Sequence, residues 1–431
     1  LVDLAERRAL LARDRLGIKP LYTTRGPGWL AVASEIKQFR ALAGFAPRPN
    51  PSAVADYLAT GYERPGSTFF AGVEPLAPGH YQLIPLDTLR AGPPMPYWFP
   101  ERVRVEVTRA EEAARRFRAA FEESVRIHLR SDVPVGCALS GGLDSSSIAA
   151  LVARQRTADA PPLHTFSVTF PGTPIDERPY VDDVVRSLDA RAHFVTPTAE
   201  QFLEDLDDFL DKHDEPVGSL SQYAGYAVAR LTRAAGVPVT LNGQGGDEVL
   251  SGYWQCYFVH LRQLARQGRL ARLGGHLVGA MLPGGNLELV RQAPGVVRRY
   301  RARQRDAGGG QGPVQLASTL APEAWRVYEV RQLTLPRLLK WDDRNFMAFS
   351  VEGRYPLLDH PLIELCLSFA PEVLFRRGWT KHPLRQGLAD VLPASIAWRR
   401  SKWGFETPQG RWLSGGLAEP LRRLADHDGP V

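Results

Sequence analysis

The chain has 431 residues, and its 53 lysine and arginine residues against 47 aspartate and glutamate residues give a formal net charge of +6. A hydrophobic content of 44% and a charged content of 23% are typical of a globular protein and exclude a chain that is disordered throughout. At this length we expect two or three domains. No run approaches the ~18 uninterrupted apolar residues of a membrane-spanning helix, so no membrane partner is expected.

The three cysteines, Cys137, Cys256 and Cys366, lie far apart and form no CxxC pair. A disulfide framework or a cysteine-ligated zinc site is therefore not expected, and each cysteine is interpreted as a small buried apolar residue. This cysteine usage, together with the lack of a secretion signal, predicts a cytoplasmic location. The sequence starts without an initiator methionine, and we interpret it as a fragment.

Short apolar runs between glycine and proline turns predict a β-rich piece over residues 1–90. These runs cover residues 10–13, 20–23 and 29–33. The proline-rich segment 91–96 is typical of a linker. We therefore expect one domain over residues 1–92 and another over residues 105–431.

Helices and strands are expected to alternate after residue 108. Helical spacing of apolar residues predicts a helix that starts near Thr108, and further helices are expected at 145–154 and 219–235. Apolar runs predict buried strands at 133–139, 163–170, 193–196 and 237–241. This alternation predicts an α/β fold with a doubly wound parallel sheet, followed by a helical C-terminal part. Ligands of such sheets bind beyond the carboxyl ends of the strands.

Residues 140–146 form the strongest chemical motif, Ser-Gly-Gly-Leu-Asp-Ser-Ser, between a predicted strand and a predicted helix. Gly141 and Gly142 leave room for backbone N–H groups to approach an anion, and the helix N-terminus adds partial positive charge. The serines add hydroxyl donors, and Asp144 can hold Mg²⁺. Because the lysine of a Walker loop is absent, the motif is suited to pyrophosphate as a leaving group.

A second glycine-rich turn, over residues 241–248, follows the strand predicted at 237–241. Asn242 and Gly243 would let the backbone approach a nucleotide closely. Asp247 would place a second carboxylate at the same edge of the sheet, where Asp144 and Asp247 could share a metal ion.

Lysine is scarce in this chain, because only six of the 53 basic residues are lysines. One of them, Lys381, lies in the motif Trp-Thr-Lys-His-Pro-Leu-Arg at 379–385. A compact, mobile ammonium can stabilise negative charge that develops during phosphoryl transfer, which a planar guanidinium does less well. A lone lysine is usually a solvated surface residue, but its retention in a chain so poor in lysine favours Lys381 as the candidate catalytic residue.

These motifs together resemble the glutamine-hydrolysing asparagine synthetase family. The resembling segments are 13–22, 33–37, 140–146, 243–253, 343–354, 355–360 and 380–385. The resemblance implies that residues 1–92 are the C-terminal portion of an N-terminal nucleophile-type glutaminase domain. It also implies that residues 105–431 form an asparagine synthetase-like ATP-pyrophosphatase domain.

The resemblance implies an AMP-forming ligase with ATP and Mg²⁺ as cofactors. Aspartate would attack the α-phosphate of ATP to give β-aspartyl-AMP and pyrophosphate, and ammonia, normally from glutamine, would then give asparagine and AMP. Asp144 and Asp247 would bind Mg²⁺, and Lys381 would stabilise the charged intermediates. The residues implied to contact ATP or pyrophosphate are Leu139, Ser140, Gly141, Gly142, Asp144, Ser145, Ser146, Val168, Asn242 and Gly243.

Two positions depart from the family pattern. Gln244 stands where the family often has a glutamate that pairs with the lysine at the position of Lys381. Either another carboxylate takes that place or the acceptor differs, as in the related β-lactam synthetases and lasso-peptide cyclases. Residue 1 is Leu rather than the nucleophilic cysteine of a glutaminase. No glutaminase nucleophile is assigned in this chain, which we expect to use free ammonia without hydrolysing glutamine.

Other interpretations stay open from the sequence. A tRNA-modifying pyrophosphate-loop enzyme would also adenylate, but the glutaminase-like segments and the missing CxxC argue against it. A catalytically silent scaffold homologue fits Gln244 and the missing cysteine. Residues 262–305 hold ten arginines and one acid, Glu288; without interleaved aromatic residues this favours a solvated helical face over a nucleic-acid partner. A homodimer is left open.

Overall fold

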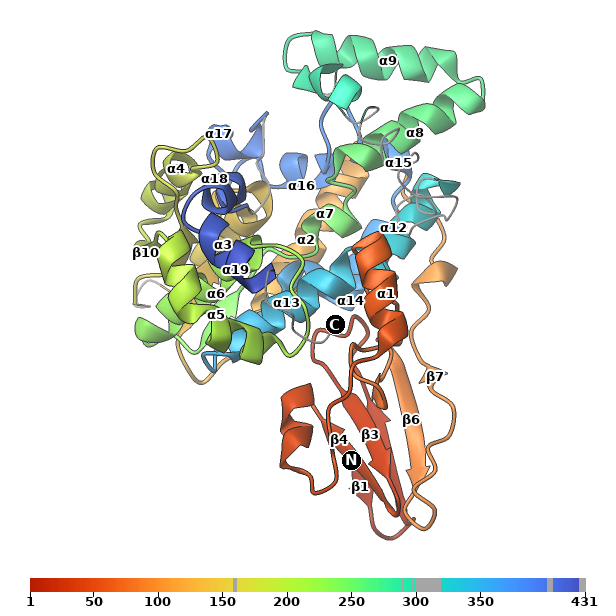
Figure 1. Cartoon of the computed structure of the whole chain (residues 1–431). Coiled ribbons are helices and arrows are strands. Elements are labelled where there is room, and N and C mark those ends of the chain that lie inside the picture. The colour runs from red at the N-terminus through yellow and green to blue at the C-terminus, as the bar shows by residue number, and fades with distance from the viewer. Residues whose placement is uncertain (158–160, 289, 296–297, 299–318, 401–405, 426–431) are drawn as a thin grey trace. The chain divides into compact units, whose positions relative to one another are not determined.

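The computed structural model describes residues 1–157, 161–288, 290–295, 298, 319–400 and 406–425 (Figure 1). The chain divides into two compact units, each assembled from three stretches. Unit 1 contains Leu1–Phe121, Gln244–Lys340 and Leu357–Gly387, and unit 2 contains Glu122–Gly243, Trp341–Pro356 and Leu388–Val431. The sequence domains expected at 1–92 and 105–431 stay a prediction.

Unit 2 contains a parallel sheet that has five strands within the described residues. The strands are β8 (Val135–Ala138), β9 (His164–Val168), β10 (Arg191–Val195), β11 (Val239–Leu241) and β12 (Glu352–Arg354). They stand in the order β10-β9-β8-β11-β12, and every neighbouring pair is parallel. The chain runs outward from β8 to β10 and then returns to add β11 and β12 on the other side. The strand order therefore reverses between β8 and β11, which is where sheets of this kind bind ligands.

Helices of unit 2 bury apolar side chains against this sheet. The helix α3 (Leu143–Gln155) contacts β8, and α6 (Ser221–Ala234) contacts β9 and β10. A buried cluster joins Phe166 of β9 to Val228 of α6 and to Phe346. A second cluster contains Phe202, Tyr223 and residues near the C-terminus such as Trp412. The remaining helices that the structure describes in unit 2 are α4 (Arg178–Leu188), α5 (Ala199–His213), α17 (Ala394–Ala397), α18 (Gln409–Ser414) and α19 (Ala418–Ala425).

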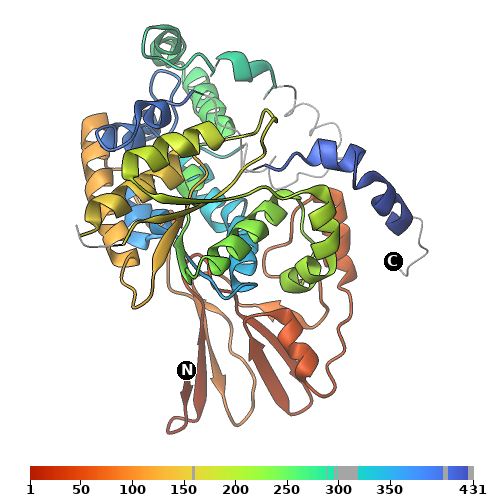
Figure 2. The same ribbon diagram turned by 90° about the vertical axis from the view of Figure 1, so that its left-hand side faces the viewer.

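In its described residues, unit 1 contains two antiparallel sheets, which Figure 2 shows as separate groups of red and orange strands. The first has the order β1-β2-β6-β7, and the second has the order β4-β3-β5. Tyr22, Ile36, Phe39 and Val73 form a small buried core beside the second sheet. The strands are β1 (Val2–Asp3), β2 (Arg8–Ala12), β3 (Tyr22–Gly26), β4 (Trp29–Ala33), β5 (Val73–Pro75), β6 (His80–Pro85) and β7 (Met95–Pro96).

Helices make up most of the rest of unit 1. The helices α8 (Trp254–Arg266) and α9 (Leu270–Met281) contact each other, and α12 (Pro322–Arg331) contacts both α8 and the short helix α7 (Gly246–Val249). The other helices among the described residues of unit 1 are α1 (Pro51–Thr60), α14 (His360–Leu367), α15 (Pro371–Leu374), α16 (His382–Gly387), and the 3-10 turns η1 (Ile36–Ala41) and η2 (Pro100–Arg102). Three elements continue from one unit into the other: α2 (Ala110–His128), α13 (Leu335–Met347) and η3 (Pro356–Leu358).

The structure confirms the predicted α/β class, with its parallel sheet and its β-rich N-terminal region. The three cysteines are buried and free, as expected. The β-rich segment also contains a helix that was not predicted, α1, in which Asn50 accepts a hydrogen bond from the backbone N–H of Ala53 and proline occupies the first turn. Within the described residues, no helix combines the length and apolarity needed to span a membrane.

Candidate active site

The motif at residues 140–146 forms a tight turn between β8 and α3. Gly141 has φ +68, a left-handed conformation that glycine adopts at little cost, and Gly142 is the N-cap of α3. The helix begins at Leu143, two residues earlier than predicted, so Asp144 lies in its first turn. The loop therefore ends directly in a helix N-terminus, as an anion-binding loop requires.

Serine hydroxyl groups close this turn from inside. Ser145 Oγ lies 3.1 Å from both the backbone nitrogen and Oγ of Ser140, and the N–H of Gly142 donates to Ser140 Oγ over 3.3 Å. Ser146 is fully buried, and its Oγ has no hydrogen-bond partner among the residues that the structure describes. A buried hydroxyl without a partner is unfavourable unless a ligand satisfies it, which is consistent with a phosphate oxygen as its acceptor.

The turns after β8 and β11 come together in unit 2. A Cβ atom at Gly243 would lie 2.9 Å from the backbone nitrogen of Ser145, so only glycine allows this approach of two backbones. Asn242 is buried, and its side-chain amide donates to Asp342 Oδ2 over 2.8 Å. The two loops predicted to bind nucleotide and pyrophosphate thus meet where the strand order reverses.

Two further predicted nucleotide contacts lie at the ends of neighbouring strands. Leu139 is buried after β8, where its N–H donates to Phe166 and its carbonyl accepts from Ser167 Oγ over 2.6 Å. Val168 ends β9 and is half-buried against apolar residues of unit 2. Both lie at carboxyl ends of parallel strands, so they share the edge on which the two loops lie.

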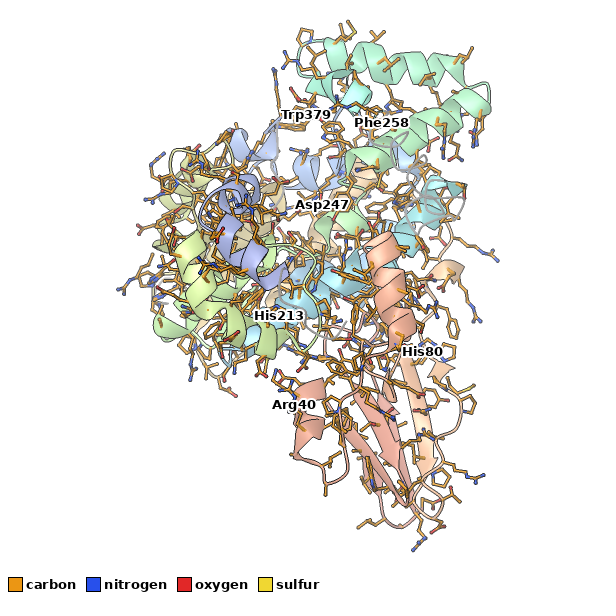
Figure 3. The ribbon with its side chains drawn as sticks, in the orientation of Figure 1. Arg40, His80, His213, Asp247, Phe258 and Trp379 are labelled. Carbon is orange, nitrogen blue, oxygen red and sulfur yellow. The ribbon has the colours of Figure 1, made fainter. Side chains whose placement is uncertain are left out.

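In unit 1, Lys381 forms an ion pair with Asp247, in which Nζ lies 2.6 Å from Oδ1. Asp247 lies in the first turn of α7 and is labelled in Figure 3. Lys381 is buried and precedes α16 with φ +52, a strained conformation for a residue other than glycine. A Cβ at Gly252 would fall 1.9 Å from Asp247 Oδ1 and 2.1 Å from Lys381 Cε, so the pair packs directly on the Gly252 backbone.

A buried group of acids beside Asp247 was missed by the sequence reasoning. Glu248 of α7 accepts a hydrogen bond from the hydroxyl of Tyr253, and Glu329 of α12 accepts one from Trp325 Nε1 over 2.8 Å. Burial, followed by the negative charge of Asp247, raises the pKa of Glu248 to about 7. Burial likewise raises the pKa of Glu329. In the sequence, the only indication of this group of buried acids is that Glu248 directly follows Asp247.

The fit of Mg²⁺ can be judged from the donor set. Asp144 is buried in the first turn of α3, and Asp247 belongs to unit 1, where it already pairs with Lys381. The described residues hold no cluster of three or more side chains suited to a metal ion. One or two carboxylates combined with substrate phosphates are the usual Mg²⁺ environment in nucleotide enzymes, so these residues fit an ion that binds together with ATP. Sharing of one ion by Asp144 and Asp247 stays a prediction.

The arginine-rich segment 262–305 lies partly outside the described residues. In its described part, Arg269 and Arg272 pair with Glu372 at 3.0 and 2.8 Å, and Arg291 pairs with Glu288 at 3.0 Å. These cations are thus engaged in ion pairs at the protein surface.

A parallel α/β sheet with a glycine- and serine-rich loop at its reversal point is the arrangement found in nucleotide-binding domains of the pyrophosphate-loop type. The asparagine synthase family model matches residues 116–430, and a glutamine amidotransferase domain model matches residues 1–98. The chain therefore belongs to the asparagine synthase family.

Curated relatives carry two kinds of name. A Mycobacterium tuberculosis protein named "Putative asparagine synthetase [glutamine-hydrolyzing]" is 30% identical over 444 residues, which cover 96% of this chain and 67% of the relative. Asparagine synthetase [glutamine-hydrolyzing] 1 of Bacillus subtilis is 26% identical, covering 96% of this chain and 68% of the relative. Amidase chry2 of Gibberella zeae is 30% identical, covering 98% and 71%. At these identities the family is shared by proteins with differently named activities.

Proposed function

We propose that this chain catalyses ATP-dependent synthesis of asparagine from aspartate through a β-aspartyl-AMP intermediate. The aspartate side-chain carboxylate attacks the α-phosphate of ATP and pyrophosphate leaves. Ammonia then attacks the acyl carbon, and AMP leaves as the amide bond forms. The observation that carries the proposal is the loop at residues 140–146, whose donors lie at the reversal point of the sheet and lack a Walker lysine.

The loop residues hold the leaving pyrophosphate in this proposal. Backbone N–H groups at Gly141 and Gly142 and the hydroxyls of the three serines supply donors, and the buried Ser146 Oγ gains an acceptor. Leu139, Val168, Asn242 and Gly243 contact the nucleotide, and Gly243 suits this role because its backbone already lies against α3. Family membership supports ATP as the nucleotide.

Lys381 stabilises the negative charge that develops as pyrophosphate departs. Its burial strengthens this effect, because a charge–charge interaction is screened less away from water. Asp247 holds the ammonium in place through the ion pair. Mg²⁺, held by Asp144 and Asp247 with the ATP phosphates, would offset phosphate charge when bound.

Ammonia is the nitrogen donor to test directly, because the synthetase activity proposed for residues 105–431 can then be measured without glutamine. The match of residues 1–98 to a glutamine amidotransferase domain supports glutamine as the usual source of the ammonia.

The decisive experiment is exchange of labelled pyrophosphate into ATP with Mg²⁺ and aspartate, followed by asparagine formation after ammonium is added. We expect exchange that depends on aspartate and is lost in Ser146→Ala, which removes the buried hydroxyl without adding volume. Ser414→Ala serves as the matched control, because Ser414 lies exposed in α18. Exchange that requires tRNA, or no exchange with any carboxylate, would overturn the proposal.

A second candidate is a related enzyme that adenylates a different carboxylate and closes an amide or lactam with another amine. Gln244 and the similarity to a protein named amidase favour it. The same exchange assay, run with aspartate, glutamate and larger amino-acid carboxylates in parallel, separates the two: exchange with another carboxylate but not aspartate selects the second candidate.

A further inference from the structure

The side chain of Arg399 contacts a main-chain oxygen of the loop at residues 140–146. It is largely buried in unit 2, directly after α17, and its Nη1 donates to the carbonyl oxygen of Gly141 over 3.2 Å. Its Nη2 lies 2.7 Å from Glu177 Oε1, and its Cζ lies 3.6 Å from the ring centre of Tyr180. One guanidinium therefore connects three groups at the start of α4 and in the loop.

The first turn of α4 also packs against Gly141 itself. A Cβ at Gly141 would fall 2.9 Å from Tyr180 Cβ and 3.0 Å from the backbone nitrogen of Val181. Gly141 is thus confined by Tyr180 and Val181 on the side where other residues carry a side chain. The same α4 turn supplies Glu177 and Tyr180, which fix the position of the Arg399 guanidinium.

The orientation of one peptide group follows from these contacts. In a trans peptide the carbonyl of one residue and the N–H of the next point in opposite directions. Arg399 holds the Gly141 carbonyl, so the Gly142 N–H points away from it, towards Ser140 Oγ at 3.3 Å. That bond is long for an N–H donor, and an anionic oxygen would accept the same proton more strongly.

We propose that Arg399 is a positioning residue for nucleotide binding, which fixes the Gly141–Gly142 peptide so that its N–H faces the leaving pyrophosphate. This inference rests on the proposed function, since it assigns the loop to the phosphates of ATP. Glu177 and Tyr180 act through Arg399, by anchoring its guanidinium from two sides. None of the three residues needs to touch the nucleotide.

Arginine is needed for this geometry. A guanidinium presents donors in a fixed planar fork and stacks on an aromatic ring, so it can bond Gly141 and Glu177 at once while covering Tyr180. A lysine ammonium is a compact charge that cannot make this combination of contacts. The Glu177–Arg399 pair is neutral overall, so in the wild type it acts on the geometry of the loop without adding net charge to it.

The test measures binding of α,β-methylene-ATP by isothermal titration calorimetry, together with KM values for ATP and aspartate in pyrophosphate exchange. We expect Arg399→Ala to weaken analogue binding and raise the KM for ATP by about tenfold or more, the effect of losing a charge-assisted hydrogen bond. The KM for aspartate should remain within about twofold of the wild-type value, whereas general damage to the fold would change both. Added methylguanidinium should restore binding in this variant, because the cavity between Glu177 and Tyr180 remains.

Three further variants provide a control and two substitutes for Arg399→Ala. Arg154→Ala is the control: Arg154 lies near the end of α3, the helix that follows the loop, and forms an exposed ion pair with Asp390 at 3.7 Å, so this variant should bind like the wild type. If Arg399→Ala does not fold, Arg399→Lys and Glu177→Gln decide the question, and both should weaken binding. Wild-type affinity in Arg399→Ala, or in both substitutes, would overturn the inference. A wild-type protein that binds no analogue would instead refute the proposed function.

Discussion

The buried Lys381 forms an ion pair with the partly exposed Asp247, with 2.6 Å between Nζ and Oδ1, and both side chains pack on the backbone of Gly252. Because residue 244 is Gln and not the glutamate common in the family, the sequence left open whether a carboxylate at another position is the partner of this lysine. Asp247, three positions after Gln244, makes that contact in unit 1. The contact favours a synthetase in which the lysine retains an acidic partner despite the amide at position 244.

Replacement of Lys381 by arginine should abolish most of the activity. The site has little room for a planar guanidinium, because Lys381 Cε lies only 2.1 Å from the position that a Gly252 Cβ would take. A displaced charge would stabilise the transition state poorly. We expect pyrophosphate release to fall about 100-fold or more. Lys212→Arg is the control, since Lys212 pairs on the surface with Asp208 at 3.6 Å. Full activity in Lys381→Arg would show that Lys381 is not the catalytic residue.

Introduction of a carboxylate at position 244 should increase the use of aspartate. In Gln244→Glu the new acid can pair with Lys381 and leave Asp247 available to Mg²⁺. Aspartate-dependent pyrophosphate release should rise several-fold at limiting Mg²⁺, whereas Gln267→Glu, on an exposed position after α8, should change nothing. An unchanged rate in Gln244→Glu would show that this position does not set the acceptor.

The variant Gly252→Ala should disturb the Lys381–Asp247 ion pair, and comparison of its activity with its thermal unfolding distinguishes this effect from a loss of stability. The new Cβ would overlap Asp247 Oδ1 and Lys381 Cε, so both side chains must move, and we expect activity to fall about 100-fold. Gly274→Ala is a matched control: Gly274 lies within α9, its Cβ position is open, and alanine there should stabilise the helix by about 0.5–1 kcal/mol. Pyrophosphate release and thermal unfolding of both variants check this, and an active Gly252→Ala enzyme would contradict it.

The anion loop could be predicted from sequence because all its parts are local. A short apolar run, two glycines and a serine-rich helix start lie within one segment, and residues 140–146 form that turn in the structure. The strand β12 could not be predicted, because Glu352, Gly353 and Arg354 show no apolar pattern and pair with β11 only through the backbone.

Contacts between distant segments could not be predicted from the sequence pattern. Lys381 stood out because lysine is rare here, but nothing local indicated Asp247 as its partner. Arg399 had the opposite problem, since it is one of 47 arginines in a chain with six lysines and no pattern separates it from those on the surface. Its burial against Gly141, Glu177 and Tyr180 appears only once α4 and α17 are folded.

A histidine pair between α8 and α9 should make the protein less stable in mild acid. His260 Nε2 lies 3.4 Å from His276 Nε2, and Tyr257 Oη lies 2.9 Å from His276 Nδ1. Burial, followed by the charge of His276, lowers the pKa of His260 to about 4, although Glu372 acts in the opposite direction and Arg272 in the same one. Burial also lowers the pKa of His276.

The sign of the effect follows from proton uptake on unfolding. Between pH 6.5 and about 4 the unfolded chain protonates His260 and the folded protein does not, so stability is present above pH 6.5 and is lost as the pH falls towards 4. His260 alone should cost about 2 kcal/mol at pH 5, measured by urea unfolding at several pH values. His260→Phe, which keeps a ring beside Phe375, should flatten this slope, whereas His360→Gln, at a half-exposed site, should retain it. Equal slopes in wild type and His260→Phe would assign the acid sensitivity to other groups.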